Sequence, residues 1–137
     1  MEKHYDLNDS EFKEQFINCE LNPSDFTHEA HLRLAWIFIG EYGPQIAENK
    51  LQTSLRKFVE HAGANDKYNT TVTVAAAKAV SHFKSKSNSD NFRDFIIEFP
   101  RLKANFKDLL AQHYGFDIYN SKKAKVEFLK PNLLPFD

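Results

Sequence analysis

The sequence has little of several features that would point to particular classes of protein. It contains four glycines, five prolines and a single cysteine, Cys19, so no disulfide can form within the chain. Its longest apolar stretch, residues 34–39, is far shorter than the ~20 residues that a membrane-spanning helix needs. The amino terminus also lacks the apolar segment of a secretory signal. These absences predict a cytoplasmic protein that does not associate with a membrane.

The chain also lacks an excess of charge of one sign. Its 18 Lys and Arg residues stand against 19 Asp and Glu residues, for a net charge of −1. Binding to nucleic acid without sequence preference depends on a basic surplus, so we expect no nucleic-acid partner. A chain of 137 residues with 42% hydrophobic residues is long enough for one core and too short for two. We therefore expect a single domain over residues 1–137.

What the chain does have is helical spacing of apolar residues between its few glycines and prolines. The run Thr70–Val74 would suit a strand by propensity, but no partner strand is evident elsewhere. The pattern therefore predicts an all-α bundle of about six or seven helices. We expect Ser10 and Thr27 to cap the first two, Ser89 or Asp90 to cap the helix that begins near residue 91, and Cys19 to occupy a core-facing position. The expected helices cover residues 10–20, 28–41, 44–63, 70–84, 91–99, 101–113 and 121–129.

The expected helix 28–41 stands out because apolar side chains point almost all the way round it. Such a helix is typical of the middle of a bundle. Gly43 and Pro44 should end it and begin the next helix, since glycine suits the turn and proline the first helical position. We therefore expect helix 28–41 to be buried at the centre of the fold.

His28 and His31 form the most suggestive pair of polar residues. Three positions apart, they share one face of the expected helix, so both rings can reach one ligand. Two such imidazoles can bind a metal, act as an acid and a base, or donate hydrogen bonds to an anion. The simpler alternative is that His28 closes the helix start and His31 packs half-buried. The spacing leaves these alternatives open.

A metal site would need at least a third ligand beside the two histidines. Glu29, His61, His82 and His113 are available, but none stands at a recognised spacing. The paired Glu-x-x-His motifs of di-iron bundles, the His-Glu-x-x-His motif of zinc proteases and the glycine-rich loops of nucleotide-binding proteins are all absent. We therefore predict that the protein holds no metal and no other cofactor.

Two more polar clusters lie near expected helix ends. The segment Tyr68–Thr73 carries hydroxyls and an amide that either cap backbone N–H groups or bind an anion. His113, Tyr114, Tyr119 and Ser121 follow another helix end, where a tyrosine hydroxyl can bridge helix and tail. Capping and bridging are the simpler interpretations. A bundle can also bring both clusters to the end where the histidine pair lies.

The chain resembles a family of small bacterial proteins of unassigned function. The most specific block is Phe26–Trp36, with the sequence Phe-Thr-His-Glu-Ala-His-Leu-Arg-Leu-Ala-Trp. Weaker similarity lies in the blocks Tyr68–Thr73, His113–Gly115 and Pro131–Phe136, and at Ser121. The resemblance therefore spans most of the chain.

This resemblance implies a one-domain helical protein and no known substrate. It places His28, His31, Tyr68, Thr71 and Tyr114 at motif positions of the family. The chain departs from the family pattern at three places: Asn69 and Thr70 replace His and Glu, and Gly115 replaces Ser. Asparagine can keep a hydrogen bond of histidine but cannot carry a proton near pH 7.

The sequence thus predicts a pocket for a small polar or anionic ligand. We expect it to be lined by His28, His31, Tyr68, Thr71 and Tyr114, with acid–base catalysis as one possible use. The alternative is a protein–protein interaction module without catalysis, in which the polar clusters are only caps and an apolar surface patch binds a partner.

Overall fold

The computed structural model describes residues 1–136, which form eight α-helices and no strand. The all-α class is therefore confirmed. The helices are α1 (Asp9–Ile17), α2 (His28–Tyr42), α3 (Pro44–His61), α4 (Thr70–Ser85), α5 (Phe92–Glu98), α6 (Arg101–Ala104), α7 (Phe106–Ala111) and α8 (Lys122–Val126). Short 3-10 turns cover Lys3–Asp6, Pro23–Asp25 and Asn65–Lys67.

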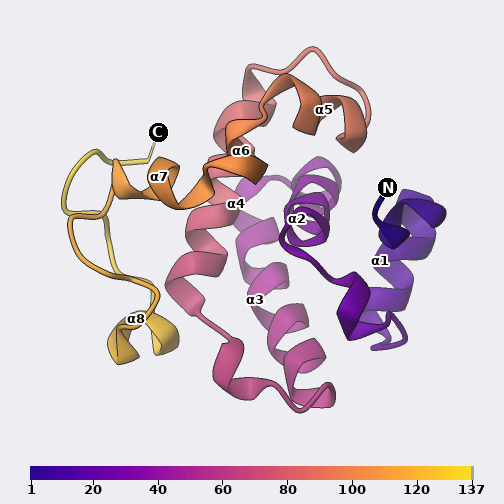
Figure 1. Ribbon diagram of the computed structural model, residues 1–137, viewed down its shortest axis with the longest axis horizontal. Helices are drawn as coiled ribbons and strands as arrows, with labels where there is room; N and C mark the ends of the chain where they lie inside the picture. The colour runs from indigo at the N-terminus through magenta and orange to yellow at the C-terminus, as the bar shows by residue number, and fades with distance from the viewer. Residues whose placement is uncertain (137) are drawn as a thin grey trace.

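Helices α2, α3 and α4 pack on one another and form the centre of the molecule (Figure 1). The amino terminus and α1 lie on one side of this centre. Helices α7 and α8 and the carboxyl-terminal segment, residues 127–136, lie on the other side. In α2, residues 29–39 are buried with the single exception of His31. This confirms the expectation of a buried central helix, in which His31 is the one half-buried residue of that stretch.

Several of the predicted helix boundaries follow from local chemistry. The Thr27 hydroxyl accepts a hydrogen bond from the Ala30 N–H, so α2 begins at His28 as predicted. Gly43 has a φ of 82°, a left-handed conformation that glycine adopts without strain, and Pro44 begins α3 directly after it. The Asn69 side chain accepts from Val72 N–H and starts α4, so the β-branched run is helical.

Three local predictions are wrong. Asn8, not Ser10, caps α1, because its side chain and that of Glu11 bond reciprocally to each other's backbone N–H groups. Asn91, not Ser89 or Asp90, caps α5, because its side chain accepts from Asp94 N–H. Cys19 lies beyond the end of α1 with a φ of 59° and is half-buried, so it is not a core residue of that helix.

The expected helix 101–113 is interrupted at Asn105, which separates α6 from α7. Asn105 has φ and ψ of −131° and 38°, outside the helical region. The carbonyl of Leu102, which a continuous helix would bond to the N–H of residue 106, is instead bonded to Nε2 of His28 at 3.0 Å. This side-chain bond from α2 satisfies the carbonyl that the break releases, and it explains why seven expected helices become eight.

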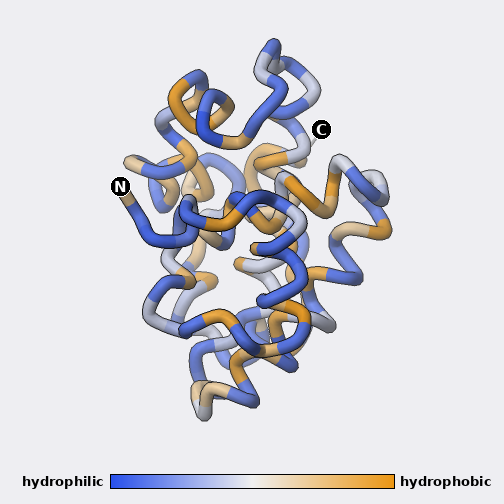
Figure 2. The backbone as a smooth tube through the Cα atoms, turned by 90° about the vertical axis from the view of Figure 1, so that its right-hand side faces the viewer, coloured by the Kyte–Doolittle hydropathy of each residue, from blue (hydrophilic) through white to orange (hydrophobic). Residues whose placement is uncertain are grey.

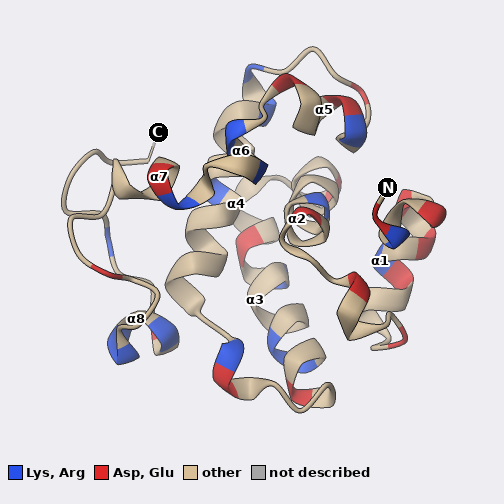
Figure 3. Ribbon diagram, in the orientation of Figure 1, with Lys and Arg blue, Asp and Glu red and all other residues tan. Residues whose placement is uncertain are grey.

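Hydrophobic and hydrophilic residues are interspersed along residues 1–136. Figure 2 shows hydrophilic and hydrophobic stretches alternating along the whole backbone. Among residues 1–136, no helix has the length and apolar character needed to cross a membrane. Acidic and basic residues are spread over most elements, with basic residues on α6, at the start of α7 and on α8 (Figure 3).

Candidate functional site

The structure brings two of the five predicted site residues into one cavity. His31 of α2 and Tyr68, just before α4, line a cavity of about 320 Å³ between α2, α3 and the start of α4. The other lining residues are mostly apolar: Pro23, Phe26, Leu55, Phe58, Val59, Ala62, Ala64, Lys67, Asn69, Val72 and Thr73. This volume lies at the lower end of the range for small-molecule pockets.

Two polar side-chain groups of the residues that line this cavity lack a hydrogen-bond partner. His31 Nε2 and the Tyr68 hydroxyl are shielded from solvent and make no hydrogen bond to any residue of 1–136. The great majority of buried polar side-chain atoms in proteins are hydrogen-bonded. Two other polar side chains of the wall are engaged: Asn69 accepts from Val72 N–H and donates to Ile118 O, and the Thr73 hydroxyl donates to Asn69 O. Two unbonded polar groups in one apolar cavity are therefore suited to a ligand with a polar end.

The electrostatic state of His31 follows from its position. Burial of the ring, with a smaller contribution from the charge of His28, lowers the pKa of His31 to about 4. The ring also packs on Phe26, with centroids 5.8 Å apart. At neutral pH, His31 is therefore an uncharged imidazole with one donor and one acceptor nitrogen.

Positive charge lies at the edge of the same cavity. Lys67 is exposed and makes no ion pair with any of the described residues. The guanidinium of Arg56 lies 5.0 Å from the centroid of the Tyr68 ring and donates to the Thr70 hydroxyl at 3.3 Å. Because two cations lie near the unbonded Tyr68 hydroxyl, the cavity favours a ligand with an anionic group over a ligand with a cationic group.

His28 faces a different cavity. Its Nε2 must carry a hydrogen, because the partner atom, Leu102 O, can only accept. The ring also packs on Phe106 at 4.7 Å between centroids. His28 therefore supports the α6–α7 break, and it lines a cavity that also contains Val72, a residue shared with the His31 cavity.

Thr71 and Tyr114 line neither of the two histidine cavities and instead hold the carboxyl-terminal segment. The Thr71 hydroxyl donates to Glu127 O at 2.8 Å and accepts from Leu129 N–H at 3.1 Å. The Tyr114 hydroxyl donates to Leu129 O at 2.7 Å. Both side chains are buried, and all their bonds run to backbone atoms. These two residues therefore anchor a segment of the chain, which is the simpler interpretation that the sequence offered for their clusters.

Replacing Thr71 with valine is expected to lower the free energy of unfolding by about 2 kcal/mol, because two buried hydrogen bonds are lost at nearly constant volume. Chemical denaturation with urea measures this change. Thr53→Val, at an exposed position of α3, is the matched control and should change stability by less than about 0.5 kcal/mol. Equal effects of the two substitutions would contradict the anchoring role.

A buried charged network that sequence reasoning missed lies on the opposite side of α2. His4, Glu29 and Arg33 are all at least 95% buried, and Glu2 lies beside them. Lys103 forms an ion pair with Glu29 at 2.6 Å. Burial alone would raise the pKa of Glu29, but its bond to Lys103 and neighbouring groups hold that pKa below the ordinary value. The one signal in the sequence was that Glu29 and Arg33 lie on the same face of the expected helix. Their partner His4 lies in the separate turn Lys3–Asp6, so nothing in the sequence indicated that the three residues meet.

Glu2, His4 and Glu29 bring their ligand-type atoms within 4.8 Å of one another, the one such group among the described residues. The donor set does not favour a metal. Arg33 Nη1 lies 3.2 Å from His4 Nδ1, and arginine can only donate, so Nδ1 must accept and Nε2 carries the hydrogen. A metal ligand needs a free nitrogen lone pair at that position. Arg33 and Lys103 already balance the carboxylates, so we read this group as an internal salt-bridge network.

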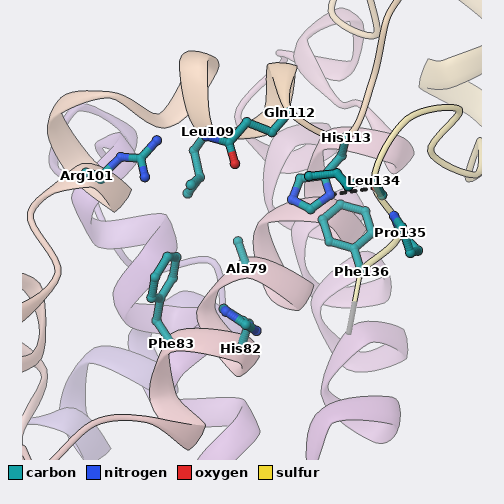
Figure 4. Close-up of a pocket in the computed structure, with 10 residues that line it drawn as sticks. All are labelled: Ala79, His82, Phe83, Arg101, Leu109, Gln112, His113, Leu134, Pro135 and Phe136. Atoms are coloured by element: carbon teal, nitrogen blue, oxygen red, sulfur yellow. Dashed lines mark hydrogen bonds between the residues drawn. The ribbon is translucent and has the colours of Figure 1, made fainter.

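Another cavity, of about 310 Å³, lies between α4, α6, α7 and the carboxyl-terminal segment (Figure 4). His82 and Phe83 lie below it, Arg101 and Gln112 above, and His113 beside Phe136. His113 Nδ1 is 2.8 Å from Leu134 O, and the ring stacks on Phe136 at 4.2 Å. His113 is thus occupied in holding the carboxyl-terminal segment against the body of the protein.

Comparison with known proteins adds no relative: no family model, no curated protein and no solved structure matches this chain. The resemblance to a family of small bacterial proteins therefore stays a prediction.

Proposed function

We propose that this protein binds a small molecule with an apolar body and an anionic end in the cavity that contains His31 and Tyr68. The observation that carries the proposal is the pair of buried polar groups, His31 Nε2 and the Tyr68 hydroxyl, with no bonding partner in the part of the chain described. Lys67 at the edge supplies the charge that an anion requires. Phe26, Leu55 and the other apolar wall residues suit a hydrocarbon or aromatic body.

Binding is better supported than acid–base catalysis. A general base works best when its pKa lies near the working pH, whereas the pKa of His31 is lowered to about 4. In the free protein His31 is a weak base and a good neutral donor or acceptor. A bound carboxylate beside it would raise that pKa again, so ligand binding at mildly acidic pH should be accompanied by proton uptake.

Docking of a partner protein is the alternative, and it has less support. The exposed large apolar side chains come from several separate elements: Met1 at the amino terminus, Ile46 of α3, Ile97 of α5, Phe116 after α7, Val126 of α8, and Leu133 and Leu134 of the carboxyl-terminal segment. Single exposed apolar residues are normal on protein surfaces. The proposal keeps the expectations of a cytoplasmic protein of bacterial type with no nucleic-acid partner.

Tyr68→Phe tests the proposal, because it removes the unbonded hydroxyl alone. Isothermal titration with hexanoate should show a loss of affinity of about tenfold for this variant. Its stability should be equal to or above that of the parent protein, since no hydrogen bond within the described chain is lost. Hexylamine, with the opposite charge, should not bind.

Tyr114→Phe is the matched control, since that hydroxyl donates to Leu129 O. It should lose about 1 kcal/mol of stability and keep the hexanoate affinity of the parent protein. The proposal is overturned if hexanoate and its longer homologues do not bind, or if they bind equally well to Tyr68→Phe.

A further inference from the structure

Aromatic rings form much of the wall of the cavity that contains His31 and Tyr68. The rings of Phe26 and Phe58 line it together with those two polar rings. The centroids of Phe26 and Phe58 lie 5.2 Å apart, and the centroid of Phe26 lies 5.8 Å from that of His31. These separations are in the range that aromatic pairs prefer. Phe26 therefore already makes ring contacts with two other rings of the wall.

The position of this wall is set by a phenylalanine from a third element. Phe16 of α1 is fully buried, and its ring centroid lies 4.8 Å from that of Phe26 and 4.7 Å from that of Phe58. Phe26 is half-buried in spite of these neighbours, so part of its ring can take a further contact. Because the rings are held by the core before any ligand enters, ordering them on binding costs little.

The size of the cavity indicates how large an aromatic body it can take. A cavity of about 150 Å³ lined by apolar side chains is sufficient to hold one benzene ring. The volume here is about 320 Å³, roughly twice as large. It therefore has room for a body of two fused rings that carries one polar group.

A rigid ligand also fits the way in which the polar groups are placed. The Tyr68 hydroxyl and His31 Nε2 belong to rings, and neither group has a hydrogen-bond partner within residues 1–136. The Arg56 guanidinium lies 5.0 Å from the Tyr68 ring centroid and so packs on that ring. A carboxylate joined directly to an aromatic body loses little conformational freedom on meeting such fixed groups, whereas an alkyl chain must first be ordered.

We propose that the ligand of this cavity is an aromatic carboxylate with a body of two fused rings, which contacts the Phe26 ring while its carboxylate accepts from the Tyr68 hydroxyl near Lys67. This inference rests on the proposed function, because it names the class of molecule that the same cavity takes. It selects an aromatic body over the alkyl body that the apolar wall also allows.

The test compares 2-naphthoate with decahydronaphthalene-2-carboxylate by isothermal titration at neutral pH. The two ligands share one carbon skeleton and one charge, but only the first is aromatic. The ratio of their affinities should be about fivefold more in favour of 2-naphthoate in the parent protein than in Phe26→Leu. Phe116→Leu is the matched control, because Phe116 is exposed and lies outside this cavity, and it should keep the ratio of the parent protein.

A second measurement needs no variant and serves where Phe26→Leu does not fold. In proton NMR spectra of the parent protein, the ring currents of the wall should shift the signals of bound 2-naphthoate upfield. Bound 2-naphthoate without such a shift would overturn the inference, since its rings would then not lie against the rings of the wall.

The outcomes separate this inference from the proposed function. Hexanoate binding that depends on Tyr68, with neither two-ring carboxylate bound or with no preference between them that Phe26→Leu changes, would overturn the aromatic ligand and leave the proposed function intact. If no carboxylate binds, the proposed function is overturned, and this inference with it.

Discussion

Arg33→Met is expected to lower the free energy of unfolding by about 3–5 kcal/mol, since it removes the central cation of a buried network. The guanidinium donates to His4 O at 2.6 Å, to Leu7 O at 2.8 Å and to Asp9 Oδ1 at 2.9 Å. It also lies 4.7 Å from the centroid of the Phe12 ring. Without it, the carbonyl groups of His4 and Leu7 lose their donor and Asp9 loses its ion-pair partner. Urea denaturation followed by circular dichroism measures the change.

Arg93→Met is the matched control, because Arg93 is exposed and its main contact is a distant one to the Tyr5 ring at 6.0 Å. This variant should differ from the parent protein by less than about 0.5 kcal/mol. A loss below about 1 kcal/mol for Arg33→Met would show that the network contributes little to the fold.

Acidification from pH 6.5 to pH 4 is expected to destabilise the protein by up to about 3 kcal/mol through His31 alone, at about 1.4 kcal/mol per pH unit. The folded protein titrates His31 at about 4 and the unfolded chain near 6.5, so the unfolded chain binds the proton more tightly. Stability is therefore fully present above pH 6.5 and falls as the pH drops. Burial and the charge of Arg33 also lower the pKa of His4, which adds in the same direction.

His31→Gln should flatten this part of the stability profile, measured by urea denaturation at a series of pH values. His61→Gln controls for the removal of one histidine, because His61 is exposed at the end of α3. A second loss should begin below pH 4.5, since the pKa of Glu29 is lowered in the fold and its stabilisation disappears as that carboxylate is protonated. If the free energy of unfolding of His31→Gln depends on pH between 6.5 and 4 as steeply as that of the parent protein, the His31 imidazole is solvated and the prediction is wrong.

The sequence was sufficient for the elements whose boundaries depend on neighbouring residues. Thr27, Gly43 and Pro44 act within one helical turn, and the start of α2 and the junction with α3 lie where those residues predict. The break at Asn105 was not predictable in this way. It depends on His28, more than seventy positions away in the chain, whose imidazole replaces the missing backbone donor at Leu102 O.

In the candidate site, too, features set by neighbouring residues were predictable and features that depend on distant residues were not. Periodicity placed His28 and His31 on one face of α2, but it could not show that the two side chains line different cavities. Thr71 follows Asn69 by two positions and still points to a different part of the molecule, because successive helical positions face different directions. The network of His4 with Arg33 required the docking of the amino-terminal turn, for which the sequence carries no periodic signal.

The helical body of the protein binds the carboxyl-terminal segment in the way that a receptor binds a peptide. Thr71, Tyr114 and His113 bond to the backbone of Glu127, Leu129 and Leu134, and the Phe136 ring stacks on His113. The segment is therefore held through both its backbone and a side chain. Because the peptide is tethered, it meets this receptor at a high effective concentration, of millimolar order for a short flexible connection. Contacts too weak to hold a free peptide therefore suffice, and losing one of them loosens the segment without releasing it.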